Sequence, residues 1–273
     1  MNKSILYRIC VIVTVALVTS CVGWYPRFNA KHFYSDPRVI ELCEGIKRND
    51  RARVERALAS GADLHASGRD GMTPLCWTFY RQKKDMFKLL LEKGADPNFH
   101  MVTEHRGTAS VLEFAIFLGM TEYVDFMLQY TVDLDLNIPN ATYFNRTPIY
   151  QAISSSEIEI EMVSKFLEYG ADLEWSDEIG LTPLLYAVRH GKYEIALLLI
   201  DRGADLNAVT TRRRLTVVDL LEKDTVGHTS RKYPQKLAFA RFLIVQGMSV
   251  DLEIIKEGWD ITWEKKNGKW KRK

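Results

Sequence analysis

The cysteine at position 21 has the chemistry and the placement of an acylation site. Cys21 follows an apolar run from Ile9 to Val18, and the basic residues Lys3 and Arg8 precede that run. The run has about ten residues, which suits the core of a signal peptide and falls short of the roughly 20 that a spanning helix needs. A thiol is the nucleophile that can take up a diacylglyceryl group, so we expect Cys21 to carry lipid.

The residues Val18-Thr19-Ser20-Cys21 resemble the lipobox of bacterial lipoproteins. The resemblance implies that residues 1–20 are a signal peptide and that residues 21–37 form an acylated tether. Val22 follows the cysteine in place of Asp, which by the Gram-negative sorting rule implies the outer membrane, facing the periplasm. Each buried methylene contributes about 0.8 kcal/mol, so three acyl chains would anchor the protein stably in a membrane.

Two other interpretations of the leader stay open. An uncleaved anchor helix from Ile5 to Val22 would make Cys21 incidental. A signal peptide without lipid is the other alternative, although the leader contains no A-x-A cleavage site.

The remaining groups that can do chemistry are scattered. Cys10, Cys43 and Cys76 form no C-x-x-C pair, and His100 and His105 lie in a loop without an acid or thiol close by in sequence. We therefore expect no metal and no cofactor. The sequence also lacks G-x-S-x-G, a phosphate-binding glycine loop and any Ser/His/Asp set in a recognisable context, so we expect that the protein is not an enzyme.

Composition and charge agree with a folded, non-basic protein. Hydrophobic residues make up 47% of the 273 residues and charged residues 26%, which is the balance of a globular chain. Lys and Arg number 37 against 35 acidic residues, and removal of the leader with Lys3 and Arg8 leaves 35 of each. We expect no nucleic-acid partner, because the bulk charge is balanced.

Most of the chain consists of copies of one repeated motif. Gly61 and Gly94 are separated by the same interval as Gly170 and Gly203. Its glycine signature occurs as SGADLHA (60–66), KGADPNF (93–99), YGADLEW (169–175) and RGADLNA (202–208). The matching starts are DGMTPLCWTF (70–79), NRTPIYQA (145–152) and DEIGLTPLLYA (177–187). Thr can cap a first helix, Pro suits its first turn, and Gly provides the left-handed end of a second helix. One such unit cannot bury its apolar face alone, so the units must stack.

These motifs and their interval resemble the ankyrin repeat, whose period is about 33 residues. The resemblance implies an all-α solenoid of helix-turn-helix pairs with β-hairpin fingers, over residues 38–255, with about six repeats including caps. Cys43 and Cys76 occupy equivalent places in adjacent repeats. Stacked helices lie about 8–10 Å apart, beyond the roughly 7 Å limit for a disulfide, so we expect two buried thiols.

Three irregularities point to functional surfaces. The connections from Asp96 to Ser110 and from Asp133 to Thr147 span 14 residues, against 10 in the regular copies, and about ten residues are inserted within the last repeat. In the ankyrin family the finger tips and the exposed end of each first helix hold a protein partner on the concave face. Transferred by register, these places are Tyr80, Arg81, Phe117, Leu118, Arg189 and His190 on helices, and Met72, Arg106, Tyr143, Phe144, Arg146, Ile179, Leu181, Arg212, Arg213 and Arg214 on fingers.

Exposed aromatic, Met and Arg residues are typical of interface hot spots, so we expect these residues to bind a protein. Alternatives remain for two groups. Phe117 and Leu118 can pack under a long finger, and Arg212 to Arg214 can be a solvated run in place of a reader of an acidic surface.

Residues 256–273 are basic and contain Asn267-Gly268, a strong hairpin signal that sets Lys265 opposite Trp270. One interpretation is a tryptophan lid over the last repeat. The other is a basic, aromatic patch for anionic lipid.

A lipobox followed by ankyrin repeats resembles the immunity proteins that neutralise lipase or phospholipase effectors of the type VI secretion system. That resemblance implies a non-enzymatic lipoprotein that binds such a toxin and blocks its active site. An envelope scaffold that tethers a partner without inhibiting it is the alternative, and a lipid-surface binder acting through residues 256–273 is a third.

Overall fold

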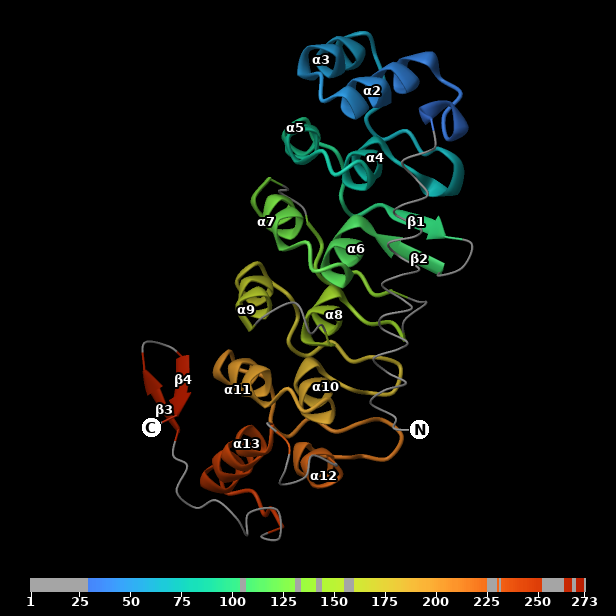
Figure 1. Ribbon diagram of the computed structural model, residues 1–273. Helices are drawn as coiled ribbons and strands as arrows, with labels where there is room; N and C mark the ends of the chain where they lie inside the picture. The colour runs from blue at the N-terminus through green and yellow to red at the C-terminus, as the bar shows by residue number, and fades with distance from the viewer. Residues whose placement is uncertain are drawn as a thin grey trace. The chain divides into compact units, whose positions relative to one another are not determined.

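The computed structural model (Figure 1) describes residues 29–103, 107–130, 134–140, 144–154, 160–224, 230, 232–251, 263–266 and 269–272. The chain forms two compact units. The first comprises Met1–Leu112 and Glu122–Leu134, and the second comprises Glu113–Thr121 and Asp135–Lys273.

The first unit is built from short helix pairs and one β-hairpin. Its elements are η2 (Ala30–His32), α2 (Pro37–Arg48), α3 (Arg51–Ala59), η3 (Arg69–Gly71), α4 (Pro74–Tyr80), α5 (Lys84–Glu92), β1 (His100–Thr103), β2 (Gly107–Ser110) and α7 (Thr121–Tyr130). Helix α2 packs on α3 and α4, and α4 packs on α5. Strands β1 and β2 are antiparallel, with His100 opposite Ser110, so the long connection after Asp96 forms a hairpin as expected.

The second unit repeats the same pairing. After α6 (Val111–Phe117) come α8 (Pro148–Ser154), α9 (Ile160–Glu168), α10 (Pro183–Arg189), α11 (Tyr193–Asp201), α12 (Val217–Glu222), α13 (Tyr233–Val245), β3 (Trp263–Lys266) and β4 (Lys269–Arg272). The first helices of successive repeats, α8, α10 and α12, lie side by side, and the second helices α9, α11 and α13 form a second row (Figure 1). The all-α ankyrin architecture predicted from the repeats is confirmed.

The Thr-Pro motifs begin first helices, as predicted. The hydroxyl oxygen of Thr73 accepts from the backbone N–H of Cys76, and that of Thr182 accepts from the N–H of Leu185. Thr216 lacks a following proline and instead forms a reciprocal capping box with Asp219. At these three helix starts the caps satisfy N–H groups that would otherwise lack partners, whereas the Thr147 hydroxyl before α8 forms no such bond with the residues that the structure describes.

The two predicted buried thiols are confirmed. Cys43 and Cys76 are both free and fully buried. Burial in an apolar core raises the pKa of each thiol, which keeps both groups protonated and unreactive.

The expected tether is wrong for residues 29–37, because residues 29–36 pack in the first unit and Pro37 begins α2. Ala30 is fully buried, and the Phe33 ring packs edge-on against Trp77 with centroids 5.7 Å apart. The Tyr34 hydroxyl donates to the carbonyl of Met72 at 2.9 Å. Aromatic rings of this size stabilise the fold most when they are covered, so this segment packs on α4 and does not extend into solvent. Residues 1–28, with Cys21, lie outside the described residues.

The C-terminal strands have the predicted register. Strands β3 and β4 are antiparallel, and Lys265 lies opposite Trp270. Asn267, Gly268 and residues 252–262 lie outside the described residues, so the lid and the lipid patch both stay predictions. Within the described part of the chain, no helix is both long enough and apolar enough to span a bilayer.

Candidate partner-binding site

The first unit holds four of the sixteen residues that we expected to contact a partner, three of them described. Tyr80 and Arg81 are half-buried at the end of α4, with the Arg81 guanidinium 4.2 Å from the centre of the Trp77 ring. The expectation that Met72 is exposed is wrong, because only 2% of its surface is accessible and Tyr34 fixes its backbone. Arg106 and Tyr143, which belongs to the second unit, lie outside the described residues.

Leu181 is also buried, so the expectation that it presents a finger tip is wrong. Its N–H donates to Oδ1 of Asp177 at 2.9 Å, and its carbonyl accepts from the Tyr150 hydroxyl at 2.7 Å. Leu181 and Met72 occupy the same place, directly before Thr-Pro, and in both units a tyrosine hydroxyl binds the carbonyl there. The residue before the first helix is therefore a packing position.

Phe117 and Leu118 lie at the end of α6. Phe117 is 44% exposed and Leu118 is half-buried. The exposure of the Phe117 ring agrees with a contact surface, and its binding role stays a prediction.

The Arg146 side chain contacts a buried carboxylate and three aromatic rings of the second unit. Its Nε donates to Oδ2 of Asp177 at 2.9 Å, and the Asp177 side chain is completely buried. The Arg146 guanidinium also lies over three aromatic rings, at 4.6 Å from Tyr186, 5.0 Å from Phe144 and 6.0 Å from Tyr150. A cation over ring faces is attracted by the ring quadrupoles, which fixes the guanidinium in one place.

Phe144 is held in an unusual conformation next to this arginine. Its φ is 61°, a left-handed value that bulky residues rarely adopt, and 52% of its surface is exposed. The Phe144 carbonyl accepts from the N–H of Glu178 at 3.1 Å, which fixes the backbone. The left-handed backbone and the exposed ring agree with a contact position, and the binding role of Phe144 stays a prediction.

The finger at residues 177–181 is tied to its neighbours on both sides. Oδ1 of Asp177 accepts from the N–H of Ile179 at 3.0 Å as well as from Leu181. Gly180 has a φ of +78°, and a Cβ there would lie 2.8 Å from Cγ2 of Thr211 and overlap the Thr211 amide. Glycine is required at this position because the finger at residues 210–215 passes directly beside it.

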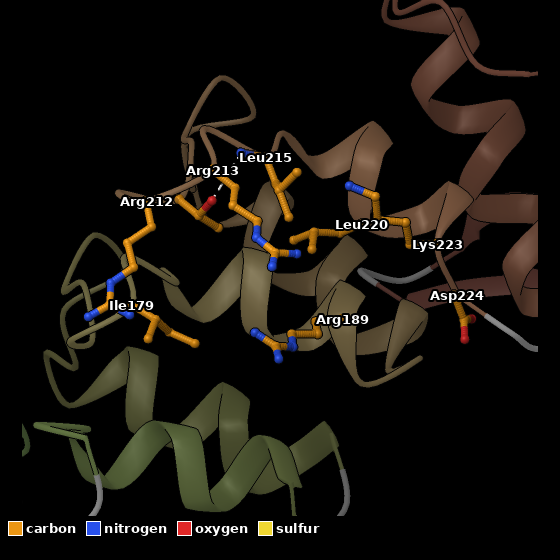
Figure 2. Close-up of a pocket in the computed structure, with 9 residues that line it drawn as sticks. Ile179, Arg189, Arg212, Arg213, Leu215, Leu220, Lys223 and Asp224 are labelled. Atoms are coloured by element: carbon orange, nitrogen blue, oxygen red, sulfur yellow. Dashed lines mark hydrogen bonds between the residues drawn. The ribbon is translucent and has the colours of Figure 1, made fainter.

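Residues of these two fingers and of helices α10 and α12 line an open pocket of about 460 Å³ (Figure 2). We call it the cationic pocket. Its lining residues are Ile179, Arg189, Thr210, Arg212, Arg213, Leu215, Leu220, Lys223 and Asp224. Thr210 pairs with Leu215 through two hydrogen bonds, of 2.9 and 3.1 Å, which close the finger that carries the two arginines. Figure 2 shows the side chain of Arg189 extending from α10 and that of Arg213 from this finger, and both residues line the pocket.

The charge around this pocket is unbalanced. Arg189, Arg212, Arg213 and Lys223 are all exposed, and none of them forms an ion pair with the residues that the structure describes. The acidic residue in the lining, Asp224, accepts a hydrogen bond from the Tyr193 hydroxyl. The geometry therefore favours an anionic partner. Arg214 is exposed but does not line the pocket, although it is adjacent to Arg213.

His190 shares this positive environment. Its ring packs on Tyr186 with centroids 4.3 Å apart, which removes water from part of the imidazole. This desolvation, reinforced by the charges of Arg189, Arg146, Lys192 and Lys232, lowers the pKa of His190 to about 4. The imidazole is therefore neutral at pH 7 and can donate or accept a hydrogen bond.

Sequence reasoning predicted Ile179 and the three arginines of the pocket. It did not predict the remaining lining residues, which are Thr210, Leu215, Leu220, Lys223 and Asp224. It also missed Asp177, which does not line the pocket but fixes the finger that carries Ile179. The signal for Asp177 was present, because it follows Arg146 by close to one repeat period. No group of three or more His, Cys, Asp or Glu residues in the described part of the chain could hold a metal ion.

Known proteins with similar sequences contain ankyrin repeats. The ankyrin repeat protein FPV014 of fowlpox virus is 29% identical over 170 residues, which cover 62% of this chain and 37% of that protein. The palmitoyltransferase AKR1 of Lachancea kluyveri is 29% identical over 180 residues, covering 65% of this chain and 24% of that protein. The chain thus spans well under half the length of these relatives.

Solved structures agree with the fold. The ankyrin repeat domain of Bcl-3, a member of the IκB family, has a TM-score of 0.59 at 22% identity and covers 77% of this chain and 86% of that one. Such repeats typically form non-enzymatic scaffolds for protein–protein interaction. The family model for ankyrin repeats (three copies) matches residues 42–140 and 112–210, and the chain therefore belongs to the ankyrin repeat family.

Proposed function

We propose that this protein is a lipid-anchored binder that holds a protein partner on the surface formed by Phe144, Arg146 and the cationic pocket. The observation that carries the proposal is a group of four exposed cations around one open pocket, none with an ion-pair partner among the described residues: Arg189, Arg212, Arg213 and Lys223. Like charges held together repel one another, and a partner of opposite charge would relieve this repulsion. The exposed Phe144 ring adds the apolar anchor that interface centres usually contain.

We further propose that the partner is a lipase or phospholipase effector and that binding covers its active site. The support is the family resemblance of a lipobox followed by ankyrin repeats, together with the absence of any catalytic motif in the sequence. In this mechanism the binder covers the entrance of the toxin's active site, so membrane lipid cannot reach the catalytic residues. Lipid attached to Cys21 would place the binder at the outer membrane, where its effective concentration against the toxin is highest.

The experiment uses the full chain, purified in detergent, and lipase-type effectors, beginning with any that is encoded beside its gene. Calorimetry would measure the affinity, and hydrolysis of a phospholipid substrate would measure inhibition. A Phe144→Ala, Arg189→Ala variant should weaken binding by roughly 2–4 kcal/mol. Arg202→Ala is the matched control, because Arg202 lies outside the pocket and pairs with Glu168.

Inhibition that disappears with binding would support the toxin-blocking role. Binding without inhibition would instead identify an envelope scaffold. Equal affinity of the Phe144→Ala, Arg189→Ala variant and the control would contradict the proposed surface. Metabolic labelling with palmitate tests the anchor separately, because Cys21→Ser should abolish both the label and recovery in the outer-membrane fraction.

A further inference from the structure

We propose that the cationic pocket binds an acidic peptide segment of the partner, in which Asp or Glu residues flank an aliphatic or aromatic residue. The inference rests on the proposed protein-binding function and specifies the chemistry that the site recognises. The juxtaposition behind it is four exposed cations around the apolar side chains of Ile179, Leu215 and Leu220.

The cations favour carboxylates. Three of the four are arginines, whose planar guanidinium groups bind a carboxylate through two parallel hydrogen bonds. Arg189 comes from α10, while Arg212 and Arg213 come from the finger, so the guanidinium groups approach the pocket from more than one side (Figure 2). This arrangement suits several carboxylates spaced along one segment better than a single ion.

The apolar residues distinguish a peptide from a nucleic acid. Ile179 and Leu215 are half-buried, and Leu220 is 6% exposed, so the pocket offers an aliphatic surface between the cations. Among the described residues, no aromatic ring on which a base could stack lines the pocket. An aliphatic or aromatic side chain of the peptide would cover this surface while the flanking carboxylates reach the guanidinium groups.

The pocket is held in shape before any partner arrives. Asp177, fixed by Arg146, binds the N–H groups of Ile179 and Leu181, and Gly180 lies directly against Thr211. The hydrogen bonds between Thr210 and Leu215 close the arginine finger. A preformed site loses less conformational entropy on binding, which favours affinity for a short segment. The volume of about 460 Å³ is typical of ligand sites and can hold a few side chains.

The test uses the full chain and three fluorescein-labelled dodecapeptides. One alternates Glu with Leu, the second replaces every Glu by Gln, and the third replaces every Leu by Ser. Fluorescence anisotropy would measure binding to the wild type, to R212Q/R213Q and to R214Q. The R214Q variant is the matched control, because Arg214 adjoins the other two but does not line the pocket. R189Q gives a second pocket variant on another element, and thermal melting would establish that each variant is folded.

We expect the Glu-Leu peptide to bind the wild type at least about tenfold more tightly than either other peptide. R212Q/R213Q and R189Q should each lose at least about tenfold, while R214Q stays within about twofold of the wild type. Binding should also weaken as salt rises, because the Debye length falls from about 10 Å at 0.1 M to about 3 Å at 1 M.

Three results would overturn the inference. The first is equal loss in R214Q and R212Q/R213Q, which would indicate general attraction between charges. The second is equal affinity for the Glu-Ser and Glu-Leu peptides, which would remove the role of the apolar residues. The third is a single-stranded oligonucleotide, as long as the dodecapeptides, that binds the wild type more tightly than the Glu-Leu peptide does.

This inference and the proposed function fail separately. A partner that binds R212Q/R213Q as tightly as the wild type would overturn the pocket's role while leaving protein binding intact. Conversely, binding of the Glu-Leu peptide at the pocket, without binding or inhibition of any lipase-type effector, would contradict the toxin-blocking function. It would leave the peptide-binding inference intact.

Discussion

The Nε atom of Arg146 lies 2.9 Å from Oδ2 of Asp177, and the Asp177 carboxylate is completely buried. The other oxygen of the same carboxylate accepts from the N–H groups of Ile179 and Leu181. One finger of the second unit thus fixes the next through a single carboxylate, and Ile179 then lines the cationic pocket. The pocket's shape depends on a pair that does not itself line it.

Removal of the Arg146 guanidinium should therefore destabilise the protein. Arg146→Met keeps much of the side chain but leaves the buried Asp177 charge without its cation, so we expect the free energy of unfolding to fall by about 2–4 kcal/mol. Denaturant unfolding followed by circular dichroism would measure the change. The control is Arg202→Met, which breaks an exposed pair with Glu168 at 3.3 Å and should cost less than about 1 kcal/mol. Equal losses in the two variants would contradict the buried pair's role.

A methyl group at position 180 should disturb the pocket directly. In Gly180→Ala the left-handed backbone costs about 1–2 kcal/mol, and the overlap with Thr211 adds to it. Gly203→Ala is the matched control, because Gly203 has a φ of +99° with open space around it and would show the backbone cost alone. Calorimetric melting would compare the two. A Gly180→Ala protein as stable as Gly203→Ala would show that the two fingers do not meet closely.

The depressed pKa of His190 predicts a loss of stability in mild acid. The imidazole titrates near 6.5 in the unfolded chain and near 4 in the folded protein. The unfolded state therefore takes up the proton first as pH falls, and the contribution of His190, fully present above about pH 6.5, is lost progressively towards pH 4. Urea unfolding at several pH values should show this slope reduced in His190→Gln. An unchanged slope would mean that the ring titrates alike in both states.

The buried thiols should be inert until the first unit unfolds. Cys43 and Cys76 are fully covered, and burial raises the pKa of both. Iodoacetamide at pH 8 should modify neither in the native protein and both in denaturant, because the thiolate is the reactive form. Peptide mass spectrometry would locate the modification. Native labelling of Cys76 would contradict the packing of α4.

The contact between Tyr34 and Met72 should be needed for the stability of the first unit. Tyr34→Phe removes the donor and leaves the Met72 carbonyl with the N–H of Gly68, so we expect a loss of about 1 kcal/mol. Tyr169→Phe is a suitable control, because Tyr169 is 51% exposed. Chemical denaturation would distinguish them, and an equal, negligible effect of both changes would indicate that residues 29–36 do not stabilise the fold.

The sequence by itself determined the repeat, the helix starts and the thiols. The constant repeat period, Thr-Pro at first helices and Gly at the ends of second helices act locally, through caps and backbone conformation. These local signals do not depend on the residues of neighbouring repeats. For the same reason, the Asn267-Gly268 sequence was enough to predict the register of β3 with β4.

Only the tertiary structure decided which finger residues face solvent and which cations meet. The repeat register predicted that Met72 and Leu181 are exposed finger residues, like Phe144 and Ile179. In the structure Met72 and Leu181 are buried, and tyrosine hydroxyls from elsewhere in the chain bind their backbone carbonyls. Likewise the cationic pocket joins Ile179, Arg189, the finger at 210–215 and Lys223, whose approach depends on how one finger packs against the next. A period specifies equivalent positions, whereas burial and charge pairing depend on contacts between segments that lie a whole repeat apart in the sequence.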